Sequence, residues 1–170
     1  MTRRGVAILP LLAAMLAIAG AASAQSSSAE KDSLLQLLVG DWSMTGDVRG
    51  KPVEYRMDAR RTLNGRYVEM HMIDVARPPA YEARVFLGVD PDQNRYIVHW
   101  LDSSGAAYSI PHGLGTANGD TIRFEFRYAD GPFRDQLAFD RRSHEWRFHL
   151  ESGDSSGVWR PFADYRVRRR

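Results

Sequence analysis

Residues 85–105 read VFLGVDPDQNRYIVHWLDSSG, and this stretch shows how the rest of the chain is built. Two apolar runs, residues 85–89 and 96–101, flank the turn sequence of residues 90–94. The proline of this turn restricts φ, and aspartate and asparagine tolerate the backbone angles that a chain reversal needs. The flanking runs are rich in β-branched and aromatic residues, which favour strands. The stretch therefore predicts two paired strands joined by a short turn.

The same pattern recurs along most of the chain. Residues 53–63 alternate apolar with charged side chains, and Asn64-Gly65 follows, a strong signal for a tight hairpin turn. Residues 121–128 alternate in the same way, with aromatic and aliphatic side chains on one face and charged side chains on the other. About ten short strands joined mainly by tight turns predict an all-β sandwich or barrel.

Sequential hairpins favour an antiparallel up-and-down arrangement of these strands. Closing the sheet on itself protects its two edge strands, so we favour a β-barrel over a sandwich. A short helix is predicted before the first strand, with Asp32 or Ser33 as its N-cap and Gly40 at its end. Because so short a helix is unstable alone in water, it must pack on the barrel.

The first 24 residues differ in character from the remainder of the chain. Arg3 and Arg4 precede an almost wholly apolar run, and Ala22-Ser-Ala24 provides a small-residue cleavage site. These features predict a secretory signal peptide, with an uncleaved N-terminal anchor as the alternative. We therefore expect a signal peptide over residues 1–24, a flexible lead over 25–31 and a single domain over 32–170. The predicted location is the periplasm or the exterior, reached by the general or the twin-arginine route.

The charge balance and the cysteine content of the chain limit the kinds of molecule that it is expected to bind. Two of the 23 basic residues lie in the predicted signal peptide, so the remainder balances the 21 acidic residues. A near-neutral domain gives no electrostatic reason to expect a nucleic-acid partner. The chain has no cysteine, which excludes disulfides, thiolate nucleophiles and cysteine metal ligands. We predict no membrane span in the mature chain, and a homodimer stays open.

No catalytic signature appears in the sequence, neither a zinc-protease helix motif, a nucleophile elbow nor a phosphate-binding loop. Two of the five histidines, His71 and His99, have apolar neighbours on their strands. Inside a barrel they could ligate a haem iron or hold an anionic ligand, and a hydrogen-bonded structural role is the alternative. Asp135 shares a face with Phe133 and Leu137, so its carboxyl must find a partner or shift its pKa.

The aromatic residues concentrate in the predicted strands, and a closed barrel of this many strands is wider than side chains comfortably fill. The sequence therefore predicts a cavity for a small apolar or amphipathic molecule. The predicted ligand-binding residues are Arg66, His71, His99, Trp100, Tyr108, Phe124, Phe126, Tyr128 and Asp135. A shift of one residue in register would exchange the two faces of a strand, so the direction of His99 relative to Trp100 decides which can contact a ligand.

Gly40-x-Trp42, following a short helix, resembles the G-x-W signature of lipocalins and related calycin barrels. Three later segments sharpen the resemblance: RTLNGRY at residues 61–67, LGVDP at 87–91 and RYIVHWLDS at 95–103. Their order is that of an uncharacterised group of bacterial lipocalin-like proteins, often exported. The chain departs from this group at Val89, where a tyrosine is usual. The resemblance implies a barrel with an internal cavity and no assigned reaction.

The resemblance also implies roles for single residues. In lipocalins the tryptophan of the signature is structural and packs against an arginine of the last strand, which implies Trp42 with Arg166 or Arg168 here. The related nitrobindin-like haem barrels use a proximal histidine near the C-terminal end. The last predicted strand, residues 158–167, has no histidine, although the preceding hairpin has two.

Together these observations predict an exported, non-enzymatic barrel that binds a small molecule and carries no cofactor. One alternative is an isomerase or hydrolase that uses His71 with Glu69, or His99 with Asp102, as an acid–base pair. Haem binding is a second alternative, and a purely structural role in an envelope assembly is a third.

Overall fold

The computed structural model describes residues 31–170. The predicted signal peptide and nearly all of the predicted lead lie outside the described residues. Within the described range, no helix is both long and apolar enough to span a bilayer.

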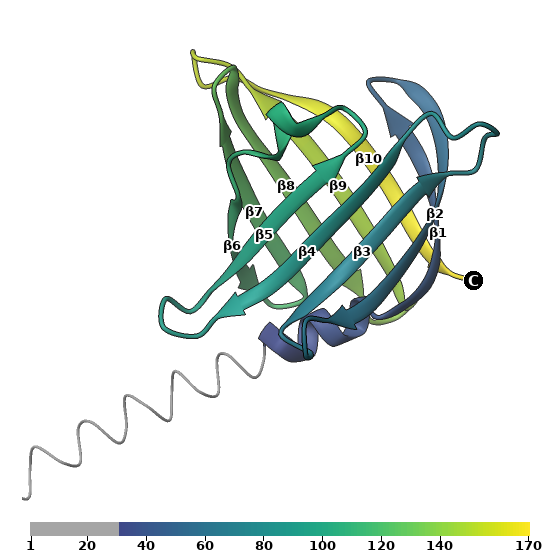
Figure 1. The fold of residues 1–170 in the computed structure, drawn as a ribbon, viewed down its shortest axis with the longest axis vertical. Coiled ribbons are helices and arrows are strands. Elements are labelled where there is room, and N and C mark those ends of the chain that lie inside the picture. The colour runs from purple at the N-terminus through teal and green to yellow at the C-terminus, as the bar shows by residue number, and fades with distance from the viewer. Residues whose placement is uncertain (1–30) are drawn as a thin grey trace, which may run out of the picture.

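Ten antiparallel strands follow one another around a closed barrel (Figure 1). Each strand pairs with the next along the chain, and the first also pairs with the last, so no strand of the described chain is left as an edge. The strands are β1 (Gly40–Val48), β2 (Lys51–Thr62), β3 (Tyr67–Asp74), β4 (Glu82–Asp90), β5 (Arg95–Asp102), β6 (Gly113–Asn118), β7 (Thr121–Tyr128), β8 (Gly131–Asp140), β9 (Glu145–Gly153) and β10 (Trp159–Arg169). Residues 31–38 are helical, and a 3-10 turn, η1 (Ala106–Ser109), separates β5 from β6. The predicted all-β, up-and-down barrel with a short N-terminal helix is confirmed.

The turn between β4 and β5 shows how sequence sets the register. A carboxylate oxygen of Asp90 accepts hydrogen bonds from the backbone N–H groups of Asp92 and Gln93, each at 3.2 Å. Asn94 adopts φ 49°, a left-handed angle that asparagine tolerates. The two strands then pair from Asp90 opposite Arg95 onward, as the opening stretch predicts.

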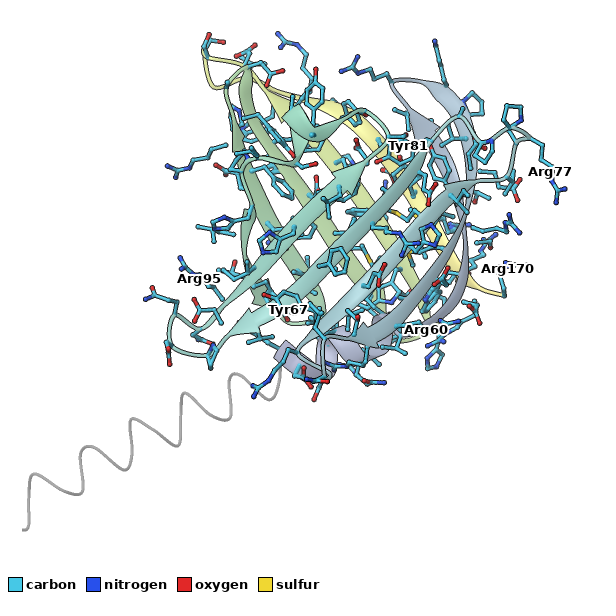
Figure 2. The ribbon with its side chains drawn as sticks, in the orientation of Figure 1. Arg60, Tyr67, Arg77, Tyr81, Arg95 and Arg170 are labelled. Atoms are coloured by element: carbon cyan, nitrogen blue, oxygen red, sulfur yellow. The ribbon has the colours of Figure 1, made fainter. Side chains whose placement is uncertain are left out.

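Alternation along the strands divides the barrel into an inner and an outer face. Tyr55, Met57 and Ala59 of β2 are buried, and the charged residues between them are exposed. In β5, Tyr96 and Val98 are buried and their neighbours point outward. Charged side chains cover the outer face, and Figure 2 shows arginines of several strands and turns projecting away from the barrel.

The helix of residues 31–38 lies across one end of the barrel and closes it (Figure 1). Leu34, Leu35 and Leu38 are buried in the common core. The backbone carbonyl of Lys31 accepts a hydrogen bond from the Tyr96 hydroxyl at 3.2 Å, which ties the start of the helix to β5. The helix thus gains through packing the stability that its length alone cannot supply.

Trp42 joins the helix to the barrel at this closed end. Its side chain is fully buried, and its indole N–H donates to the backbone carbonyl of Leu38 at 2.7 Å. The guanidinium carbon of Arg169 lies 4.2 Å from the centre of the Trp42 ring, a cation–π contact. A Cβ at Gly40 would come within 1.8 Å of the Arg169 guanidinium and displace it, and φ there is +149°, so this position favours glycine.

The arginine that covers Trp42 is therefore Arg169, and the expectation of Arg166 or Arg168 is wrong. In the register of β1 with β10, Trp42 lies directly opposite Arg169. Side chains alternate along a strand, so Arg168 points to the outer face, where its Nε lies 2.9 Å from Glu145. Arg166 also faces outward and lies 3.6 Å from the same carboxylate.

Candidate functional site

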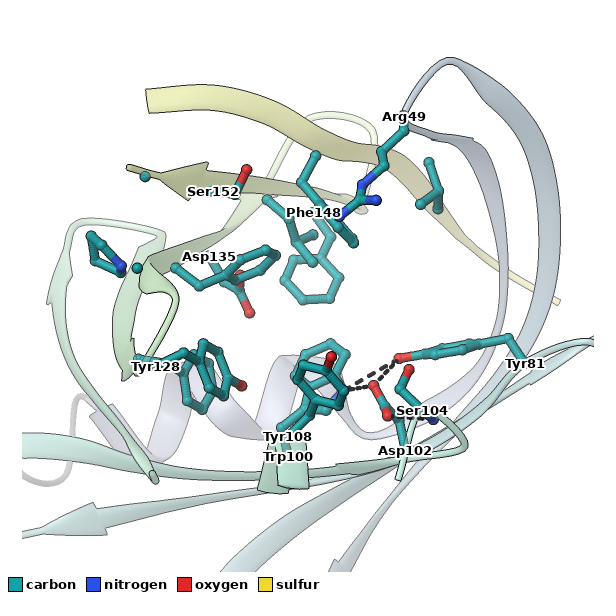
Figure 3. A pocket seen from close by; sticks show the side chains of 18 of the residues that line it. Arg49, Tyr81, Trp100, Asp102, Ser104, Tyr108, Tyr128, Asp135, Phe148 and Ser152 are labelled. Atoms are coloured by element: carbon teal, nitrogen blue, oxygen red, sulfur yellow. Dashed lines mark hydrogen bonds between the residues drawn. The ribbon is translucent and has the colours of Figure 1, made fainter. Parts of the chain in front are cut away.

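A cavity of about 570 Å³ opens at the end of the barrel opposite the helix. Turns of an up-and-down barrel alternate between its two ends, and this end carries the turns after β1, β3, β5, β7 and β9. Aromatic rings from β2, β5, β7, β8, β9 and β10 form most of the wall (Figure 3). The structure thus contains an aromatic-walled cavity of the kind predicted.

The aromatic rings of the wall pack in pairs. The rings of Phe126 and Tyr128 stack with their centres 5.6 Å apart, and those of Trp100 and Phe148 lie 6.0 Å apart. These contacts fix the ring faces that border the cavity, so the wall is formed before any ligand arrives.

Asp135 projects from β8 into this wall (Figure 3). It lies on the inner face with Phe133 and Leu137, as the alternation predicts, and only 2 % of it is exposed. Neither carboxyl oxygen has a hydrogen-bond partner within residues 31–170. Burial raises the pKa of the Asp135 carboxyl well above its ordinary value, so the neutral, protonated form is favoured. The wall of the cavity therefore contains a carboxyl group with unused hydrogen-bonding capacity.

A second polar group lies nearer the mouth, around Asp102. One of its carboxylate oxygens accepts hydrogen bonds from the Tyr81 hydroxyl and from the Trp100 indole N–H, both at 3.1 Å. Its other oxygen accepts from the backbone N–H of Ser104 at 2.8 Å. Burial, with the nearby Asp102 carboxylate adding to it, raises the pKa of the Tyr81 hydroxyl. Asp102 thereby fixes the positions of the Tyr81 and Trp100 side chains in the cavity wall.

Two tyrosines complete the polar lining. Burial and then the Asp135 carboxyl raise the pKa of Tyr128 to about 12. Burial first, and then Tyr55 and Asp135, raise the pKa of Tyr165. Both hydroxyls therefore stay protonated at neutral pH and can act as neutral donors and acceptors.

The structure brings together about half of the residues predicted to bind a ligand. Those that line the cavity are Trp100, Tyr108, Phe126, Tyr128 and Asp135. Phe124 is buried on the same face of β7 and touches Phe126, with ring centres 5.8 Å apart, but it lies nearer the closed end. Whether any of these residues contacts a ligand stays a prediction.

The other three predicted residues, Arg66, His71 and His99, lie outside the cavity. The His71 ring lies between two carboxylates, 2.7 Å from Glu82 and 3.5 Å from Asp58, on the outer face. Residues at odd and even positions of a strand face opposite ways, so Trp100 inside places His99 outside. Arg66 is exposed beside the turn that joins β2 to β3, at the closed end.

The enzyme and haem-binding alternatives both depend on histidines inside the cavity, and the histidines lie outside it. Glu69 forms an ion pair with Arg84 on the outer face, and His99 and Asp102 point to opposite faces of β5. All five histidines lie in the described chain, and none lines the cavity. The residues present therefore offer no imidazole to a haem in this cavity, and we derive no step through one.

Sequence reasoning missed several cavity residues, of which Tyr81 and Asp102 matter most. The spacing Trp100-x-Asp102 is a signal for Asp102, since residues two apart on a strand share a face. Tyr81 lies just before β4, where no alternation predicts its direction.

Comparisons with known proteins extend these observations. A family model described as "Protein of unknown function (DUF1579)" matches residues 27–169. Among solved structures, the chain resembles that of Rv2717c from M. tuberculosis, with a TM-score of 0.54 and 16% identity over 80% of this chain and 94% of that chain. At this identity the likeness concerns the fold alone. No curated protein matches this chain.

Proposed function

This chain belongs to the DUF1579 family of proteins of unknown function, and we propose that it is an exported barrel that binds a small apolar or amphipathic molecule. The observation that carries the proposal is the open, aromatic-walled cavity with an unpartnered carboxyl in its wall. Protein interiors are normally close-packed, and their buried polar groups are normally hydrogen-bonded. Within residues 31–170 the buried Trp146 indole N–H is also without a partner, but Trp146 does not line this cavity. Open space beside an unpartnered carboxyl is best explained by binding.

The size and lining of the cavity suit such a ligand. Its volume of about 570 Å³ lies within the usual range of small-molecule pockets. Apolar rings supply most of the wall, and a few fixed polar groups, among them Asp102 and Tyr128, are available to orient a head group. The enzyme and haem-binding hypotheses have no comparable support, because their histidines lie elsewhere.

We also propose that the barrel is related to the lipocalins. This relationship is supported by the arrangement of Gly40, Trp42 and Arg169 at the closed end, which matches the role that the resemblance assigns to such residues. Export is supported by the character of residues 1–24 alone. N-terminal sequencing of protein isolated from its own cells tests it, and we expect the mature chain to begin at Gln25. An intact N-terminus would contradict export by cleavage.

Native mass spectrometry of protein purified from its own cells tests the binding proposal. We expect a bound small molecule that is released on unfolding. A titration with the neutral fluorescent probe N-phenyl-1-naphthylamine then locates the binding. Ser152→Trp, which adds a ring at the cavity mouth, is expected to weaken probe binding. His149→Trp on the outer face of the same strand is the matched control. Ligand-free protein that also ignores the probe would overturn the proposal.

A further inference from the structure

We propose that the molecule bound in this cavity is a cation, an amphipathic amine whose ammonium group pairs with Asp135 while its apolar body packs on the aromatic wall. This inference rests on the proposed function and names the class of ligand. Three independent features of the cavity carry it: the surroundings of Asp135, the charges of the lining and the ring faces.

The first feature is the environment of Asp135. In the sheet it lies opposite Phe124 of β7 and Leu150 of β9, neither of which can donate a side-chain hydrogen bond. Both carboxyl oxygens lack a partner within residues 31–170. An ammonium group has three donors and a positive charge, so it satisfies a buried carboxylate in both respects. A ligand carboxylate in the same place would add a second unpaired acid.

The second feature is the balance of charge around the cavity. The charged residues that line it are Asp102, Asp130, Asp135 and Arg49. The only basic one, Arg49, is exposed at the rim, with its guanidinium carbon 4.8 Å above the Phe162 ring. Asp102 is held by three hydrogen bonds and is fixed in place. Asp130 is exposed as well. The charged residues deeper in the lining are therefore Asp102 and Asp135, with no basic side chain beside them in the wall, and this favours a cation over an anion.

The third feature is the set of ring faces beside the acidic groups. The Phe126–Tyr128 stack and the Trp100–Phe148 pair both border the cavity. The faces of aromatic rings attract cations, and desolvated cation–π contacts are stronger than exposed ones. Rings on several sides and a carboxyl in one wall form a combination that recognises an ammonium group more specifically than a neutral one.

Binding should also move one proton. Asp135 is packed between β7 and β9, and its carboxyl acts electrostatically on the hydroxyls of Tyr128 of β7 and Tyr165 of β10. Burial raises the pKa of both tyrosines, so they keep their protons at neutral pH. When a protonated amine enters, the O–H bond of Asp135 breaks, its proton leaves to solvent, and a carboxylate–ammonium pair remains. Amine affinity should therefore rise with pH until the free amine itself loses its proton.

Isothermal titration calorimetry with three ligands of one shape tests the inference: 2-naphthylmethylamine, 2-naphthylmethanol and 2-naphthoate. For the native protein we expect the amine to bind at least roughly tenfold more tightly than the alcohol, and the carboxylate most weakly. Asp135→Asn should remove the preference for the amine over the alcohol. Asp120→Asn, the same substitution at the closed end, is the matched control and should keep the preference.

The outcomes separate the two proposals. If none of the three ligands binds, the proposed function and this inference both fail. If the alcohol or the carboxylate binds as tightly as the amine, the cavity binds ligands but the cation assignment is overturned.

A second measurement does not depend on the folding of a variant. Titrations of the native protein in two buffers with different heats of ionisation should show net proton release when the amine binds and none when the alcohol binds. No proton release with the amine would contradict the pairing with Asp135.

Discussion

The two ends of this barrel use the same strands in opposite ways. At the closed end, the buried Trp42 N–H has its acceptor in Leu38 and its ring is covered by Arg169. At the open end, the aromatic rings leave a cavity of about 570 Å³, and the buried Asp135 has no partner within the described residues. Inward-facing residues of the same alternating strands build both ends.

The difference shows where stability and binding are separated in the fold. Dense packing at the closed end, together with the hydrogen bond of Trp42 and the cation over its ring, stabilises the barrel, although the buried Trp146 indole N–H near this end has no partner within residues 31–170. Open space and an unsatisfied carboxyl at the other end lower stability and are best explained by a ligand. Substitutions at the two ends should therefore have different consequences, and the following predictions are ordered by the size of the expected effect.

The largest effect is expected for Trp42→Ala. It removes a fully buried ring and its hydrogen bond to Leu38, so the free energy of unfolding should fall by about 3–5 kcal/mol. Urea unfolding measures this loss. Trp100→Ala is the counterpart at the open end and should cost less, because that ring already borders the cavity. Equal losses for the two tryptophans would contradict the division between the ends.

Asp135→Asn is expected to stabilise the protein at neutral pH, because it replaces a carboxyl that must take up a proton on folding with a side chain that is neutral at every pH. The pKa of this carboxyl is higher in the folded than in the unfolded protein, so the folded state binds more protons. The stability of the native sequence should then fall as pH rises from about 4 through the folded-state pKa.

The gain from Asp135→Asn should accordingly vanish near about pH 4 and grow with pH, which urea unfolding at several pH values measures. Asp120→Asn is the control. Its carboxylate already accepts two hydrogen bonds from Arg141, each at 2.6 Å, so its replacement should not stabilise at any pH. A loss of stability for Asp135→Asn at neutral pH would contradict the account.

A smaller effect is expected for Arg169→Ala, which removes the cation over Trp42. The loss should be about 0.5–1 kcal/mol in urea unfolding, the usual worth of an exposed cation–π contact. Arg168→Ala is the neighbouring control, because Arg168 faces outward and contacts Glu145 instead. A larger loss of stability for Arg168→Ala than for Arg169→Ala would contradict this prediction, because the stabilising contact would then lie on the outer face of β10.

Much of the fold could be predicted from sequence because its signals are local. The turn at residues 90–94 and the alternation in β2 depend on neighbouring residues alone. The inward direction of β5 could not be read in the same way, because apolar residues occur on both of its faces. The structure places Tyr96 and Val98 inside, which puts His99 outside and keeps Trp100 at the cavity.

The cavity was predictable in kind and less so in detail. Asp135 stood out as a carboxyl on an apolar face, and it does line the cavity. Phe124 and Phe126 have the same pattern in sequence, yet only Phe126 borders open space. Depth along the barrel axis separates them, and that depends on how all ten strands and the helix close the two ends. The depth of a residue along the barrel axis therefore cannot be predicted from the spacing of residues in one strand.

The central claim is that the open end binds a small molecule and the closed end only stabilises. Nuclear Overhauser effects between bound N-phenyl-1-naphthylamine and the protein test it most directly. The account predicts contacts from the probe to Phe126, Tyr128 and Phe148, and none to the helix of residues 31–38. Contacts confined to exposed outer residues such as Leu101 and Ile110 would contradict it.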